Sequence, residues 1–150
     1  MKGGTKIFLI LLVIGGLVGA GVAYYMYNKP HENVVDSTPV HTYTATDLTA
    51  ELARDTATLK QKIAGQIIQV TGTVRLVSSD HAGGAVIQME AGNYGLNDVS
   101  LQMDAAFMDS TVLNIPAGQE ISVKGIYNGH QYEDALESWT VYLNRCVLVK

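Results

Sequence analysis

Residues 65–77 read GQIIQVTGTVRLV, and this stretch decides the fold. Apolar and polar residues alternate along it, which is the period of two that marks a half-buried β-strand. Gly72 takes one of the inward positions, and the absence of a side chain there allows a strand to bend sharply. A strand that bends in this way can serve two sides of a small barrel. The inward apolar positions are Ile68, Val70, Val74 and Leu76.

Four later segments also show strand patterns. They are residues 85–90, 99–103, 120–127 and 139–150. The third of these contains Val123-Lys-Gly125, which repeats the Val70-Thr-Gly72 pattern of the opening stretch. Two matched bend positions favour a closed barrel over an open sheet. In the last segment the apolar phase shifts at residues 144–145, which predicts a β-bulge there.

A helical pattern precedes the strands, over residues 46–64. Its apolar stripe predicts packing against the sheet, and Gly65 is a natural stop. Asp47 is the expected N-cap, while Asp55 offers a second cap that would split the segment into two short helices. The stripe consists of Leu48, Leu52, Leu59 and Ile63.

Residues 104–118 join the strand at 99–103 to the strand at 120–127, and their pattern is ambiguous. Asp104 is placed to cap a short helix through Phe107 and Met108. Pro116-Ala-Gly118 then forces a turn. We therefore expect a short helix or turn in this connection.

The first 29 residues are predicted to form a membrane anchor. Residues 7–27 carry no formal charge, and about 20 apolar residues are enough to span a bilayer core. Lys2 and Lys6 precede the run and favour a cytoplasmic N-terminus, which places the rest of the chain across the membrane. A cleaved signal peptide is the alternative, because small residues near the end of the run resemble cleavage sites. Gly15-x-x-x-Gly19 puts two glycines on one helix face, which would permit a homodimer.

Charge is distributed unevenly along the chain. After Pro30 there are 14 acidic and seven basic residues, so that part has a formal charge of −7. An acidic domain repels phosphate backbones, and the composition therefore argues against nucleic-acid binding. Cys146 is the single cysteine, which excludes an intrachain disulfide and a cysteine-rich metal cluster.

The order of these elements is that of an OB-fold, a five-stranded Greek-key barrel. Glycine and valine positions carry a closer resemblance, to the tRNA-anti-like OB-fold family of bacterial exported and membrane-anchored proteins. The resemblance covers residues 46–150 and implies a mainly β barrel, but it implies no activity. The motifs are Gly65-x-x-Ile68-x-Val70-x-Gly72-x-Val74, Gly118-x-x-Ile121-x-Val123-Lys-Gly125 and Val141-x-Leu143-Asn-Arg-Cys146-Val-Leu148.

Three parts are expected along the chain: a transmembrane anchor at residues 1–29, an extended linker at 30–45, and an OB-fold domain with a helical lead-in at 46–150. The linker contains prolines and shows no helical period. No nucleophile elbow, zinc-protease helix or phosphate-binding glycine loop occurs in the sequence, so we expect no enzyme activity, no catalytic residue and no cofactor. The acidic residues within 133–137 lack the ligand spacing of calcium loops, and no metal site is predicted.

OB-folds bind ligands on the face of their second and third strands and between two loops. Here the two loops are residues 78–84 and 128–138. Aromatic side chains near them suit stacking, but the positive groove that single-stranded nucleic acid requires is missing. The candidate ligand-binding residues are Arg75, Tyr127, His130, Tyr132 and Trp139.

The sequence thus predicts a non-catalytic binding or scaffolding module in the bacterial cell envelope. A single N-terminal helix would hold it in the inner membrane, with the C-terminal domain in the periplasm. The expected partner is an envelope protein, or a small or saccharide ligand. A protein that binds single-stranded nucleic acid is the alternative, and the fold alone is weak support for it.

Overall fold

The structure is a computed structural model that describes residues 3–28, 33–92 and 96–150. The chain separates into two compact units, residues 1–33 and 34–150. In the first unit, α1 (Gly3–Tyr27) is a 25-residue helix that is long and apolar enough to cross a membrane. A Cβ built at Gly15 or Gly19 of this helix meets no atom within 4 Å. The homodimer expected through these two glycines stays a prediction. Residues 1–2 and 29 of the predicted anchor lie outside the described residues. So do residues 30–32 at the start of the predicted linker.

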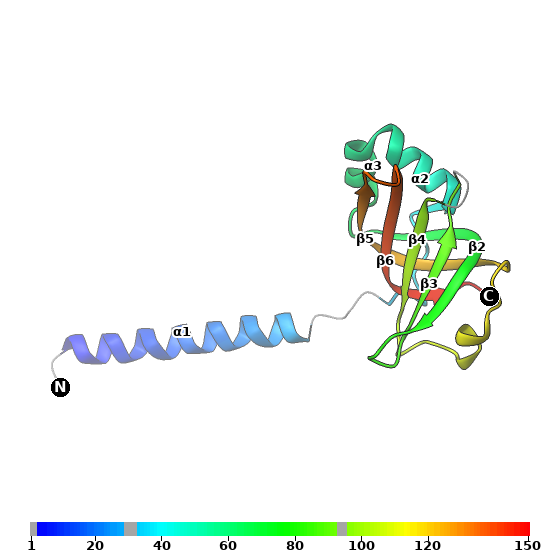
Figure 1. Ribbon diagram of the computed structural model, residues 1–150. Coiled ribbons are helices and arrows are strands. Elements are labelled where there is room, and N and C mark those ends of the chain that lie inside the picture. The colour runs from blue at the N-terminus through cyan, green and yellow to red at the C-terminus, as the bar shows by residue number, and fades with distance from the viewer. Residues whose placement is uncertain (1–2, 29–32, 93–95) are drawn as a thin grey trace. The chain divides into compact units, whose positions relative to one another are not determined.

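The second unit is a closed barrel of five strands (Figure 1). Their hydrogen-bonded order is β2-β3-β4-β6-β5, and β2 also pairs with β5 to close the barrel. β4 and β6 are parallel, whereas the other barrel pairs are antiparallel. The predicted five-stranded Greek-key OB-fold is therefore confirmed. The strands are β2 (Ile67–Ser79), β3 (Ala85–Glu90), β4 (Asp98–Met103), β5 (Glu120–Glu133) and β6 (Ser138–Leu148).

β2 changes partners along its length, and the predicted bend lies at the change. Residues 67–73 pair with β5, and residues 73–79 pair with β3. A Cβ on Gly72 would lie 2.9 Å from the Cβ of Ala45 and 3.2 Å from the Sδ of Met89. Real Cβ atoms do not approach other atoms so closely, so only glycine fits here without a shift of its neighbours.

A β-bulge at Arg75 follows this bend. The register with β3 shifts between Val74 and Leu76, so Arg75 is an extra residue on β2. The extra residue reverses the alternation beyond it. Val74 is buried as predicted, but Leu76 is 52 % exposed, and Val77 packs against the core in its place. The inward position predicted for Leu76 is wrong for this reason.

Two helices, α2 (Ala45–Arg54) and α3 (Thr56–Ile63), cover one end of the barrel (Figure 1). The two-helix alternative is confirmed, because the Asp55 carboxylate accepts a hydrogen bond from Thr58 N at 3.1 Å and caps α3. The cap of α2 is Thr44 rather than Asp47. Thr44 is the last, extended residue of a strand, and its hydroxyl accepts from Asp47 N at 3.1 Å. All four residues of the predicted stripe are buried in the core.

Part of the predicted linker belongs to the second unit. β1 (His41–Thr44) pairs in parallel with β2, and Val34 is buried against Ile67 and Val147. The Nζ atom of Lys124 donates to two backbone carbonyls of this segment, at 2.9 and 3.1 Å. A strand of four residues is too short to show a period, so the sequence pattern did not predict β1. The three-part division of the chain stays a prediction.

The connection between β4 and β5 contains a short 3-10 helix, η2 (Ser110–Asn114), which is capped by Asp109. Of the short helix or turn expected here, the structure has a turn at residues 105–107. Asp104 closes this turn by accepting from Ala106 N at 3.0 Å, and Phe107 is 55 % exposed. η2 lies later because Val112 is the side chain that enters the core.

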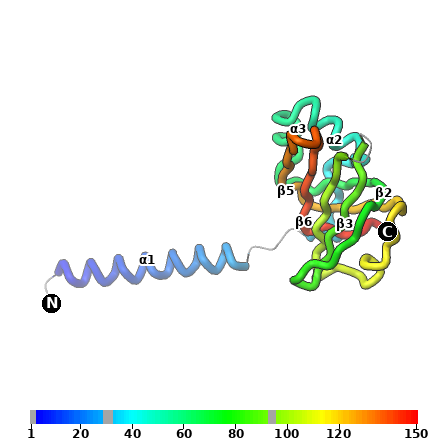
Figure 2. Tube along the Cα trace, viewed as in Figure 1, coloured from blue at the N-terminus to red at the C-terminus, as the bar shows by residue number. Residues whose placement is uncertain are grey.

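β5 and β6 form a long hairpin, which replaces most of the loop expected at residues 128–138. The two strands remain paired as far as Glu133 and Ser138, and only residues 134–137 form a turn (Figure 2). The bulge predicted in β6 is confirmed by a register shift at residues 144–145 and by a positive φ of 52° at Arg145. The hairpin matters for function, because it carries most of the candidate site.

Candidate functional site

The outward side chains of β4 and β6 form a polar surface on the barrel. Ser100 lies opposite Tyr142 in the parallel register of these strands. Their neighbours Val99 and Val141 are fully buried. Because side chains alternate along a strand, every second residue of β4 and β6 is left on the outer face. OB-folds bind ligands on the face of their second and third strands, here β3 and β4, and this surface shares β4 with that face.

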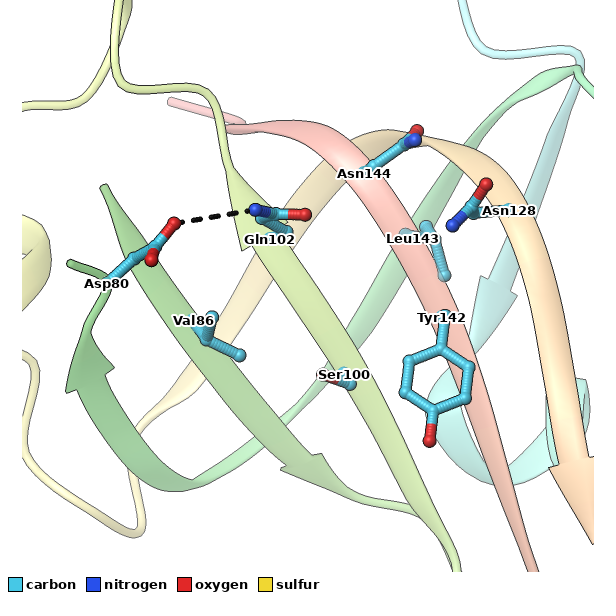
Figure 3. A pocket seen from close by; sticks show the side chains of 8 residues that line it. All are labelled: Asp80, Val86, Ser100, Gln102, Asn128, Tyr142, Leu143 and Asn144. Atoms are coloured by element: carbon cyan, nitrogen blue, oxygen red, sulfur yellow. Dashed lines mark hydrogen bonds between the residues drawn. The ribbon is translucent and has the colours of Figure 1, made fainter. Parts of the chain in front are cut away.

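A hollow of about 250 Å³ lies at one end of this face, next to the turn that follows β2 (Figure 3). We call it the amide hollow, because side-chain amides from three strands line it. Gln102 donates a hydrogen bond to Asp80 at 3.5 Å, and Asp80 itself accepts from Ala82 N at 3.3 Å. Its lining residues are Asp80, Val86, Ser100, Gln102, Asn128, Tyr142, Leu143 and Asn144.

A second hollow, of about 320 Å³, lies on the other side of Tyr142. We call it the arginine hollow. Arg75 forms an ion pair there with Asp98, and its side chain crosses β3 to reach it. The Tyr142 hydroxyl donates to the Gln131 side chain at 3.4 Å. Its lining residues are Arg75, Leu96, Asp98, Gln131, Glu133, Leu136, Ser138, Thr140 and Tyr142.

The charge of these two hollows is negative. Three carboxylates line them, from Asp80, Asp98 and Glu133, against the single guanidinium of Arg75. That guanidinium is already compensated by Asp98. A phosphate on this face would meet net repulsion, whereas neutral amides and hydroxyls offer both hydrogen-bond donors and acceptors. The face therefore suits an uncharged polar ligand.

Four aromatic side chains form a strip on the opposite face of the β5–β6 hairpin. The Tyr127 hydroxyl lies 2.5 Å from His130 Nδ1. Ring centroids are 5.7 Å apart for His130 and Trp139, and 4.8 Å apart for Trp139 and Tyr132. Tyr127 is almost fully buried, while Tyr132 at the far end is 44 % exposed. We call these four residues the aromatic strip.

Burial raises the pKa of the Tyr127 hydroxyl, and burial together with the nearby charge of Lys60 lowers the pKa of His130. At neutral pH the tyrosine therefore keeps its proton and the histidine is uncharged. Either partner can be the donor in this hydrogen bond, because a phenol hydroxyl and a neutral imidazole can each donate or accept.

The structure brings four of the five predicted site residues together and separates the fifth. Tyr127, His130, Tyr132 and Trp139 make up the aromatic strip, whereas Arg75 lies in the arginine hollow. Their role in binding stays a prediction. The residues not predicted are the amides of the amide hollow and Tyr142. In the sequence these residues are the polar positions of alternating strands. Most solvent-facing strand residues show the same pattern, so it does not single out a site.

Among the residues that the structure describes, no group of three or more His, Cys, Asp or Glu side chains could hold a metal ion. Cys146 is buried, and burial raises the pKa of its thiol far above neutrality. The thiolate is the nucleophilic form of cysteine, so this thiol is inert.

The profile of the tRNA_anti-like family matches residues 1–147. No curated protein sequence matches the chain. Among solved structures, a "putative nucleic acid-binding lipoprotein" from Klebsiella pneumoniae subsp. pneumoniae MGH 78578 is similar, with a TM-score of 0.54 and 17 % identity, over 81 % of this chain and 99 % of that one. The OBody NL8, solved bound to hen egg-white lysozyme, has a TM-score of 0.37 and 11 % identity, over 56 % of this chain and 94 % of its own.

Proposed function

Because the chain belongs to the tRNA_anti-like family, we propose that it is a non-catalytic OB-fold binding module displayed in the bacterial cell envelope. α1 would anchor it in the inner membrane, and the barrel would lie in the periplasm. Its ligand would be a neutral saccharide chain that crosses the outer face of β4 and β6, one unit in each hollow.

The observation that carries this proposal is the position of Tyr142 between the two hollows. Its ring is 38 % exposed and lines both of them. An exposed aromatic ring offers an apolar face with a polar tip, and sugar rings present a matching apolar face between their hydroxyls. Amide side chains on one side and Gln131 and Thr140 on the other would meet those hydroxyls.

Isothermal titration of the full-length protein in a polyoxyethylene detergent would test this with chitotetraose, cellotetraose and maltotetraose. We expect Tyr142→Ala to weaken binding about tenfold, equivalent to about 1.4 kcal/mol. Tyr142→Phe keeps the ring and should weaken it less. Tyr132→Ala removes a similarly exposed tyrosine from the other hairpin face and should leave saccharide binding unchanged. Equal losses from Tyr142→Ala and Tyr132→Ala, or no binding of any of the three, would refute the saccharide proposal.

Single-stranded nucleic acid is the second candidate, favoured by the description of the Klebsiella protein. Fluorescence anisotropy with a labelled 15-mer of thymidine at low salt separates the two ligands. Phosphate contacts make affinity fall steeply with salt, whereas saccharide binding does not depend on it. Micromolar, salt-sensitive binding of the oligonucleotide would replace our first choice.

A further inference from the structure

A third hollow, of about 320 Å³, lies between the end of α3 and the middle of β5. We call it the basic hollow. The saccharide site does not use it, because it opens where the aromatic strip begins rather than on the face that carries Tyr142. Its lining residues are Lys60, Ala64, Gly65, Tyr127, Asn128, Gly129 and His130.

The polar groups of the basic hollow are mainly hydrogen-bond donors. Lys60 contributes an ammonium group, His130 a ring whose Nε2 carries a proton in one neutral tautomer and in the imidazolium, and Asn128 an amide that can present its NH₂. Among the residues that the structure describes, none that lines the hollow carries a carboxylate. A donor-rich, positively charged hollow is complementary to an acceptor that carries negative charge.

The charge of Lys60 is uncompensated, and its neighbour on α3 shows the contrast. The Lys62 ammonium lies 3.8 Å from a Glu51 carboxylate oxygen and 5.8 Å from the centre of the Tyr43 ring. Lys60 makes no ion pair within the described part of the chain. Its charge acts instead on His130, whose pKa it helps to lower. The hollow is thus lined by one charged group, Lys60, and by the neutral imidazole of His130, which Lys60 keeps from taking up a proton.

We propose that the basic hollow binds an anionic group, a carboxylate or a phosphate, held by Lys60, His130 and Asn128. The anion lies between Lys60 and His130, compensates the charge of Lys60 and so allows His130 to take up a proton more readily. The aromatic strip continues from His130 to Trp139 and Tyr132, so a ring attached to the anion has a stacking surface beside it.

Nuclear magnetic resonance of the His130 ring in the full-length, detergent-solubilised protein tests the proposal, with inorganic phosphate and acetate as probes at low ionic strength. We expect saturable shifts of the His130 signals and an upward movement of its pKa, because a bound anion favours the charged imidazole. The signals of His41 and His81 should not show these saturable shifts. The relative affinities of the two probes tell phosphate from carboxylate.

Lys60→Gln and Lys62→Gln form a matched pair on one exposed helix. Lys60→Gln should weaken anion binding three- to tenfold, which is the effect of losing about one charge-assisted hydrogen bond. Without anion it should also raise the His130 pKa. Lys62→Gln should leave both quantities unchanged. Equal anion affinity in the wild type and Lys60→Gln, or His130 signals that do not saturate, would overturn the proposal. Tyr142→Ala should not change anion binding. Failure of the anion proposal is therefore distinguishable from failure of the saccharide proposal.

Discussion

Gly72 shows how one missing side chain positions a helix against the barrel. The space that its Cβ would fill is taken by the Cβ of Ala45, the first residue of α2, and by the side chain of Met89. Close packing of this kind leaves no room for even one methyl group. The glycine therefore allows both the bend of β2 and the docking of α2.

We predict that Gly72→Ala destabilises the protein by about 1–3 kcal/mol, the usual cost of adding a group to a packed core. The methyl of Ala45 is fixed to its backbone and cannot rotate away. Gly84→Ala is the matched control, because its nearest neighbour would be at 3.5 Å, an ordinary contact. Urea unfolding followed by tryptophan fluorescence measures both. Equal stability of the two variants would show that α2 adjusts freely.

Arg75 marks the limit of what a residue pattern can predict. The sequence offers it only as a candidate ligand-binding residue, whereas the structure pairs its charge with Asp98. The two residues are 23 positions apart and meet only because β3 lies between their strands. The bulge that aims Arg75 also exposes Leu76, and no composition signal announces a bulge within an apolar strand.

At the scale of elements, two aspartates appear equivalent as helix caps in the sequence, but only one of them acts as a cap. Asp55 accepts hydrogen bonds from both the backbone N and the hydroxyl of Thr58, at 3.1 and 2.7 Å. Asp47 lies inside α2, where its backbone N is bound by Thr44. The difference arises because β1 delivers an extended residue at position 44.

We predict that Asp55→Ala lowers the urea midpoint and the helix content, whereas Asp47→Ala changes them little. The hydrogen bonds with Thr58 lower the pKa of Asp55 from its usual 3.8. Its stabilising effect is therefore fully present above that value and is lost as the pH falls through the lowered pKa. Urea midpoints measured between pH 7 and pH 2 should converge for wild type and Asp55→Ala at the acid end. A constant difference down to pH 2 would contradict the capping role.

The β5–β6 hairpin explains why the candidate site was only partly predictable. Residues 128–138 are polar, which is typical of a loop, but they form paired strands because the barrel residues before and after them set the register. The alternation then sends Tyr132 and Trp139 to one face and Gln131 and Thr140 to the other. Which residues share a surface depends on this pairing.

At the scale of the whole molecule, a barrel of the tRNA_anti-like family follows an N-terminal helix that is long and apolar enough to cross a membrane. The lysines before the apolar run predict that the barrel lies across the membrane from them. An alkaline phosphatase reporter fused after Lys150 should be active, since it needs the oxidising compartment outside the cytoplasm. A fluorescent reporter that matures only in the cytoplasm should be dark at the same position. The reverse pattern would overturn the orientation.

Replacing Lys2 and Lys6 by glutamate supplies the control for this orientation. It removes the charge asymmetry without touching the charge-free run at residues 7–27, and it should lower reporter activity for the same amount of protein. Unchanged activity would show that features other than these two lysines set the orientation.

The sequence by itself determined the barrel, the helical lead-in and the apolar N-terminal helix. These follow from local patterns: a period of two in the strands, a stripe over 48–63, and a charge-free run in α1. Only the tertiary structure decided which side chains meet. The pairing of β4 with β6 placed Tyr142 between two hollows, and the docking of α3 placed Lys60 beside His130. The physical reason is that local periodicity sets which face of a strand is buried, whereas contacts across strands depend on register, bulges and closure.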